Sequence, residues 1–138
     1  MPEDWITLSP DDLATAHADP ARGIFYSPSP YNLPTAIRVS AMPSEGKRVI
    51  EFQYLDGNEP AVLEPYSGRG ICMALGKRTQ RVFRVFVDER VFRDDPQQVI
   101  TSITNALLNL RAINPRTRDN LDATSNAVSR LGERLLSG

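Results

Sequence analysis

The sequence contains very few residues of the kinds that supply reactive or metal-binding side chains. Cys72 is the only cysteine and His17 the only histidine among 138 residues. A single cysteine excludes an intramolecular disulfide framework and suggests a reducing compartment, so we expect a cytoplasmic protein. A metal ion would be left with carboxylates, and these show no calcium-loop spacing. We therefore predict no metal and no other cofactor.

The same scarcity disfavours nucleophilic catalysis. Cys72 or a serine would need a neighbouring base, and His17 lies in or near a predicted N-terminal helix. Cys72 alternates within an apolar strand pattern, which is typical of a small buried residue. Gly68-Arg69-Gly70 is followed by a predicted strand, whereas a phosphate-cradling loop needs a helix there. We predict no catalytic residues; an enzyme would need a carboxylate or tyrosine site in a cleft.

Long apolar runs are missing as well. No run approaches the roughly 20 residues that span a bilayer, and MPEDWITLSPDD lacks the basic and apolar regions of a secretory signal. With 41% hydrophobic and 24% charged residues, the composition is that of one globular domain. We expect a soluble protein with no membrane partner. Its predicted parts are an N-terminal helix and proline-rich connector (1–35), an antiparallel sheet (36–93) and a helical C-terminal part (94–138).

Most strand-like sequence lies in the central run, Arg48–Val91. Val49–Leu55 alternates apolar and polar residues, which is the pattern of a half-buried strand. Asp56-Gly57 then predicts a turn. Ala61–Leu63 can begin the returning strand, and Pro65 must end that strand or confine it to an edge, because proline has no N–H for the ladder.

Two further hairpins are predicted around this strand. Ile71–Leu75 and Arg81–Val87 are apolar segments separated by a short polar link with a glycine. Both faces of Arg81–Val87 are partly apolar, so this strand belongs under a helix or in a barrel. Ala36–Met42 predicts a strand that turns into the next one; a helix over Leu33–Met42 is the alternative, which its β-branched residues disfavour.

Helices are predicted at both ends of the chain. Ser9-Pro10-Asp11-Asp12 is typical of a helix start, and the helix would end near Ala18. The connector SPSPYNLP either packs on the sheet through Tyr31 and Leu33 or recruits a partner. Asp94-Asp95-Pro96 caps a helix with a broad apolar face. The residues of that face are Val99, Ile100, Ile103, Ala106, Leu107 and Leu110.

A final helix follows Asn114-Pro115 and has a narrower apolar stripe. The stripe consists of Leu121, Thr124, Val128, Leu131 and Leu135. Such a stripe either packs on its own domain or forms a seam with a second subunit. Self-association through the C-terminal helices is therefore one of the predicted partnerships.

The net charge is −1, but the charge is unevenly distributed. Residues 69–93 carry seven basic side chains against two acidic ones, and we call this segment the basic hairpin. Its arginines alternate with aromatic residues, and guanidinium groups pair with phosphate while aromatic rings can stack on bases. The candidate residues for binding a nucleotide or nucleic acid are Tyr54, Arg69, Lys77, Arg78, Arg81 and Arg84.

Several short motifs together resemble the WYL-type regulatory domain. They are Ile50-Glu51-Phe52-Gln53-Tyr54, Asp56-Gly57, Glu64-Pro65, the strand Ile71–Leu75 and Arg81-Val82-Phe83-Arg84. The likeness covers about a third of the chain, and Ile71-Cys72-Met73 stands where that family has Trp-Tyr-Leu. The resemblance implies an SH3-like barrel in which Tyr54, Arg81 and Arg84 line a site for a nucleotide or nucleic acid.

The sequence thus predicts an α+β domain. Its sheet is a strongly curved antiparallel sheet of about five or six strands, or a small SH3-like barrel built from hairpins, and two C-terminal helices follow. The leading functional hypothesis is a non-enzymatic binding or adaptor module, with a homodimer as one form. The alternative is a WYL-like sensor that binds a nucleotide or nucleic acid through the basic hairpin. Phosphate-driven binding should weaken steeply with salt, whereas an apolar protein interface should barely respond.

Overall fold

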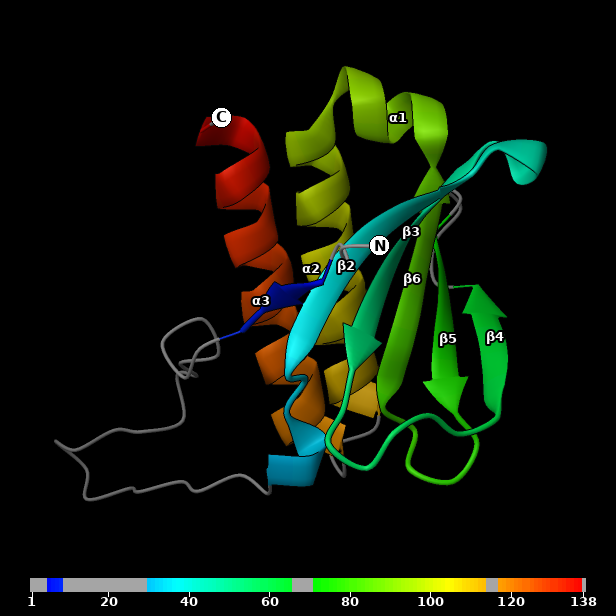
Figure 1. Cartoon of the computed structure of the whole chain (residues 1–138), viewed down its shortest axis with the longest axis vertical. Helices are drawn as coiled ribbons and strands as arrows, with labels where there is room; N and C mark the ends of the chain where they lie inside the picture. Colours follow the sequence, from blue (N-terminus) through cyan, green and yellow to red (C-terminus); the bar gives the residue numbers. More distant parts are fainter. Residues whose placement is uncertain (1–4, 9–29, 66–70, 114–116, 138) are drawn as a thin grey trace, which may run out of the picture.

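A computed structural model describes residues 5–8, 30–65, 71–113 and 117–137 of the chain. The strands are β1 (Ile6–Thr7), β2 (Ala36–Met42), β3 (Lys47–Gln53), β4 (Ala61–Pro65), β5 (Cys72–Gly76) and β6 (Val82–Asp88). The helices are α1 (Glu89–Asp94), α2 (Pro96–Ile113) and α3 (Arg118–Ser137), with 3-10 helices η2 (Pro30–Asn32) and η3 (Pro43–Glu45). All six strands form one antiparallel sheet in the order β1-β2-β3-β6-β5-β4 (Figure 1).

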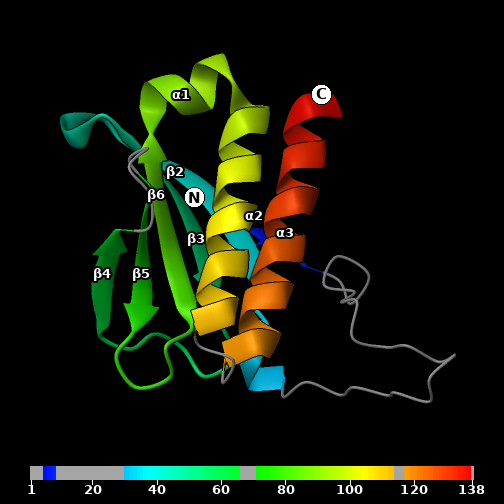
Figure 2. The ribbon, with the colours of Figure 1, turned by 180° about the vertical axis from the view of Figure 1, so that it is seen from behind.

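The sheet and the helices form two layers. α2 and α3 lie side by side against one face of the sheet, which we call the helix face (Figures 1 and 2). No helix of the described residues covers the opposite face, which we call the open face. The predicted α+β class with an antiparallel sheet and C-terminal helices is confirmed. The SH3-like barrel alternative is wrong: β1 and β4 lie at opposite edges, because α2 and α3 already cover the apolar face that a closed barrel would enclose.

The predicted hairpins on either side of the sheet centre are confirmed. β2 and β3 pair with Ile37 opposite Phe52, and Gly46 in the connection has a φ of 63°, which glycine adopts without strain. β5 and β6 pair across the polar turn after Gly76. A register shift next to Leu75 places a β-bulge in this pair. The bulge lets consecutive residues of β6, Val82 and Phe83, both be buried.

The predicted strand after Asp56-Gly57 forms at Ala61–Pro65, but it does not pair with β3. The turn itself forms, with the Gly57 amide donating to the Tyr54 carbonyl at 3.1 Å. The chain then crosses to the far edge of the sheet, where β4 pairs with β5, and β6 takes the place beside β3. Both faces of β6 are partly apolar, which favours a place in the sheet interior over an edge. β4 ends at Pro65 and occupies an edge, as the proline predicts.

The helices begin at aspartates. The Asp88 carboxylate accepts from the Arg90 and Val91 amides at 2.8 and 3.3 Å and starts α1, which sequence analysis assigned to the sheet. The sheet therefore ends at Asp88 and not at Arg93. The Asp95 carboxylate accepts from the Gln98 amide at 3.1 Å and begins α2, as predicted.

The core lies between the helix face and α2 with α3. Every residue of the predicted apolar face of α2 is buried. In α3, Leu121, Thr124, Val128 and Leu131 of the narrow stripe are buried within this one chain. That burial accounts for the stripe without a second subunit.

Some predictions about the first third of the chain fall outside the described residues. The helix from Ser9 to Ala18 is one of them. Tyr31, in η2, is 53% exposed, which does not match the predicted packing of the connector on the sheet. β1 was not predicted, because two residues are too few to show an alternating pattern.

Candidate binding surface

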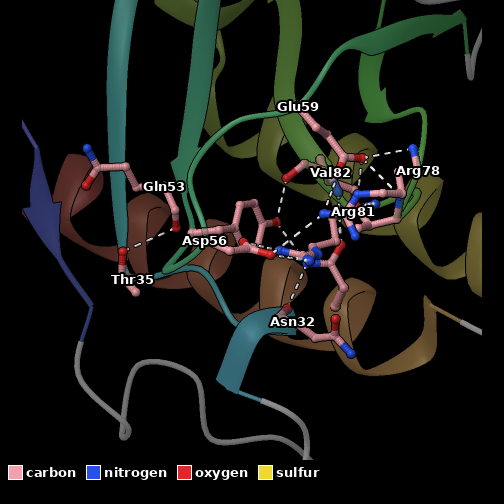
Figure 3. Close-up of polar contacts among 11 residues, drawn as sticks. Asn32, Thr35, Gln53, Asp56, Glu59, Arg78, Arg81 and Val82 are labelled. Carbon is pink, nitrogen blue, oxygen red and sulfur yellow. Dashed lines mark hydrogen bonds and ion pairs between the residues drawn. The ribbon is translucent and has the colours of Figure 1, made fainter.

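A buried polar network joins four separate segments at one end of the sheet (Figure 3). The Tyr54 hydroxyl donates to the Val82 carbonyl at 2.6 Å and accepts from the Asn120 amide at 2.8 Å. Asn120 also accepts from the Val82 amide at 3.0 Å and donates to the Asn32 carbonyl at 2.9 Å. One α3 side chain therefore connects β3, β6 and η2. Burial raises the pKa of Tyr54 far above its usual value, so the hydroxyl stays neutral.

Arg81 lies beside this network and forms an ion pair through its two terminal nitrogens. Its guanidinium donates to both carboxylate oxygens of Asp56 at 2.7 and 2.9 Å, and only 5% of the residue is exposed. The same group lies 5.3 Å from the centre of the Tyr54 ring. The hydrogen bonds from Arg81 lower the pKa of Asp56. Arg81 therefore stabilises the turn after β3.

Glu59 organises the neighbouring turn. Its carboxylate accepts from the Thr79 amide and hydroxyl at 3.0 and 2.9 Å and forms an ion pair with Arg78 at 3.5 Å. Burial alone would raise the pKa of Glu59, but these bonds lower it overall. Asp56 and Glu59 thus offset the charges of Arg78 and Arg81, so this end of the sheet attracts anions weakly.

The predicted ligand residues therefore do not form one site. Tyr54, Arg78 and Arg81 meet in the network just described, and Lys77 is exposed on the same turn. Arg84 points from the open face, on the other side of the sheet, because it pairs with Glu51 in register. Arg69 lies outside the described residues.

The open face carries a row of side chains that crosses the sheet. Strand register aligns Arg38, Glu51, Arg84, Ala74 and Leu63 on β2, β3, β6, β5 and β4. Within the row, the Glu51 carboxylate accepts from the Arg38 guanidinium at 3.0 Å. We call this set the open-face row.

Trp5 and Ser40 complete the polar end of this row. The Arg38 guanidinium lies 4.3 Å from the centre of the Trp5 ring, and the Ser40 hydroxyl donates to the second oxygen of Glu51 at 3.1 Å. Both oxygens of Glu51 therefore have donors on β2. Arg84 has no ion-pair partner in the part of the chain that the structure describes.

A hollow of about 300 Å³ lies over these residues. It is lined by Trp5, Arg38, Glu51, Phe52, Gln53, Asn58, Phe83 and Arg84. Sequence analysis missed this hollow. Polar residues that alternate along β2 and β3 are also typical of a plain solvent-exposed face, and Trp5 reaches them only through the unpredicted β1.

A second cavity, of about 380 Å³, lies between β6 and the start of α2. Ile71, Val87 and Val91 supply apolar walls, and Gln98 and Ser102 supply polar groups from α2. Among the described residues, no three histidine, cysteine or acidic side chains gather as metal ligands would. No helix in the described part of the chain has the length and apolar content to span a bilayer.

Comparisons with protein-family models, with curated proteins and with solved structures find no match to this chain.

Proposed function

We propose that the protein is a non-enzymatic adaptor that binds a polypeptide partner on the open face of its sheet. One observation carries this proposal: the whole open face lacks a covering helix among the described residues, although it bears apolar groups. Trp5, Cys72 and Phe86 are half-buried there, and Leu63 is 60% exposed. A sheet face with this mixture of aromatic, aliphatic and hydrogen-bonding groups suits a protein partner.

Nucleotide or nucleic-acid binding, as in a WYL-like sensor, is the alternative proposal. Exposed Lys77 and Arg84 support it. However, Lys77 lies in the turn between β5 and β6 while Arg84 lies on the open face, and Arg81 is buried against Asp56. A nucleic-acid groove needs several cations aligned along one phosphate backbone. The distribution of charge therefore favours the polypeptide partner.

Self-association through the C-terminal helices stays a prediction. The sequence feature that suggests it is the apolar stripe of α3, and four residues of that stripe are buried within the chain. α2 still exposes Leu108 and Ile113, at 54% and 78%. Single exposed apolar residues are common on monomers and do not define an interface.

Two exposed leucines test the proposal. A phage-displayed random peptide library is selected on the immobilised full chain, and the affinities of the selected peptides are measured by fluorescence anisotropy. Leu63→Asp on the open face should weaken binding about tenfold or more, because it puts a charge in place of an exposed apolar contact. Leu108→Asp on α2 is the matched control and should bind as the unchanged protein does.

Selection of no peptide, or of peptides that need Leu108 and not Leu63, would refute the open face as the partner surface. Salt separates the alternatives further. A single-stranded oligonucleotide that binds the full chain, with an affinity that falls about a thousandfold between 50 and 200 mM salt, would favour the nucleic-acid alternative instead.

A further inference from the structure

We propose that the partner segment carries an aspartate or glutamate whose carboxylate binds Arg84 in the open-face hollow. This inference rests on the proposed function and specifies the chemistry of the partner. The hollow is large enough for a side chain and its hydrogen-bonding neighbours. A partner acid would meet a guanidinium that has no ion-pair partner among the described residues.

The charges around the hollow lead to this assignment. The Arg38 guanidinium forms an ion pair with one carboxylate oxygen of Glu51 at 3.0 Å. The Ser40 hydroxyl donates a hydrogen bond to the other oxygen. Arg84 stands opposite Glu51 in the register, yet the carboxylate bonds to β2. The open-face row therefore keeps one uncompensated positive charge at its centre.

One buried donor without a partner also favours an acceptor in the hollow. The Arg38 Nε is buried and has no hydrogen-bond partner among the described residues. Gln53 and Asn58 add amide groups to the lining of the hollow. A carboxylate is an acceptor with two oxygens, and guanidinium and amide donors bind it well.

One negative charge suits the hollow better than several. Its lining holds two arginines and one glutamate, and the resulting charge of +1 matches one carboxylate. A nucleic acid would bring a phosphate every few ångströms along its backbone. Half-buried Trp5 also lines the hollow, and a partner polypeptide can place an apolar residue beside it.

The side chains next to the open-face row indicate which residues of the partner segment should flank its acidic residue. Phe86 and Cys72 align across β6 and β5 and are half-buried, and Leu63, which ends the open-face row on β4, is exposed. These side chains are apolar. We therefore expect an acidic residue with apolar neighbours, and not a run of acids.

Two sets of variants test the assignment. Each acid of a selected peptide is replaced by its amide, Glu by Gln or Asp by Asn, and each form is titrated against the full chain and Arg84→Gln. Arg93→Gln is the charge-matched control, because Arg93 lies on α1 and does not line the hollow. Trp5 reports occupancy by fluorescence, because it is the only tryptophan of the chain and lines the hollow.

The expected result is coupling between one peptide acid and Arg84. Arg84→Gln should weaken the acidic peptide about tenfold, the size of a partly screened charge-assisted hydrogen bond. The same variant should barely affect the amide peptide, and Arg93→Gln should affect neither. The acidic peptide should also change Trp5 emission in the unchanged protein.

Three results would overturn the assignment. If the peptides need Leu63 but bind Arg84→Gln equally well, the partner carboxylate at Arg84 is refuted, while the open face still stands as the partner surface. Peptides that need neither residue would refute both proposals. A single-stranded oligonucleotide that changes Trp5 emission through Arg84, where acidic peptides do not, would assign the hollow to a nucleic acid.

Discussion

At the scale of single residues, Asn120 is the side chain on which most of the buried polar network depends. It connects η2, β3 and β6 to α3 through three hydrogen bonds. Asn120→Ala would leave the Val82 amide unpaired at the β-bulge. We expect the free energy of unfolding to fall by about 2–4 kcal/mol, since a buried donor without an acceptor costs its full desolvation.

Urea denaturation measures this change. Asn105→Ala, at an exposed position of α2, is the control and should lie within about 0.5 kcal/mol of the unchanged protein. Equal stability of Asn120→Ala and Asn105→Ala would show that the network does not stabilise the fold.

The Asp56–Arg81 ion pair predicts how stability depends on pH. Arg81 lowers the pKa of Asp56 in the folded state, and the bonds of Glu59 and Glu89 lower theirs as well. A lowered pKa contributes stability above the unfolded pKa, near 4, and this contribution is lost as pH falls through the folded value. The melting temperature should therefore fall on acidification below about pH 4.

Asp56→Asn isolates the contribution of this pair. At pH 7 the variant should melt at a lower temperature, because it leaves Arg81 buried without its carboxylate. The difference should shrink as the pH falls through the lowered pKa of Asp56, because the carboxyl group of the unchanged protein then becomes protonated. A difference in melting temperature that does not shrink on acidification would contradict the assigned ion pair.

Only part of the site could be predicted from its residues. The resemblance to the WYL-type domain predicts that Tyr54 and Arg81 lie close together, and the Arg81 guanidinium is 5.3 Å from the centre of the Tyr54 ring. Their hydrogen-bond partners were not predictable from the sequence. Asp56 belongs to a pattern that predicts only a turn. Asn120 lies beside the apolar stripe of α3, and nothing in the neighbouring sequence indicates that it bonds to β6 and η2. Arg84 was grouped with Arg81, but alternation along β6 and the bulge place Arg84 on the other face.

At the scale of secondary-structure elements, α2 lies with α3 against the helix face of the sheet. Leu107 is 1% exposed, whereas its neighbour Leu108 is 54% exposed. Leu107→Asp should unfold the domain, because a buried carboxylate and a lost core side chain together cost more than about 4 kcal/mol. Leu108→Asp should remain folded with a nearly unchanged melting temperature.

Circular dichroism of the two variants checks this pair. A folded Leu107→Asp protein with an unchanged melting temperature would mean that α2 does not pack on the sheet in this register. The comparison is direct, because the two substitutions are chemically identical and adjacent.

The elements that sequence analysis found are those with strong local signals. α2 has a proline at its first position, an aspartate cap and a full apolar face, and all three are confirmed. The position of β4 depends on competition between strands. β3 could pair with β4 or with β6, and it pairs with β6, most of whose residues are buried. That decision is made across the whole sheet, so a local turn such as Asp56-Gly57 does not reveal it.

At the scale of the whole molecule, α3 is a part of the core and not an appendage. Leu121, Val128 and Leu131 are buried, and Asn120 is bonded to three other segments. A chain truncated after Arg116 should therefore fail to fold as a monomer, because it exposes the packed side of α2 and part of the helix face. Light scattering and circular dichroism test this; a folded monomeric truncation would contradict the role of α3.

The central claim is that the open face, with Arg84 at its centre, receives an acidic segment of a partner protein. The most direct measurement is the change in amide ¹H–¹⁵N shifts of the full chain when a selected acidic peptide is added. The account predicts the largest changes at Glu51, Ala74 and Arg84, which are neighbours in the sheet. Changes confined to α2 and α3, or to the turn around Glu59, would contradict it.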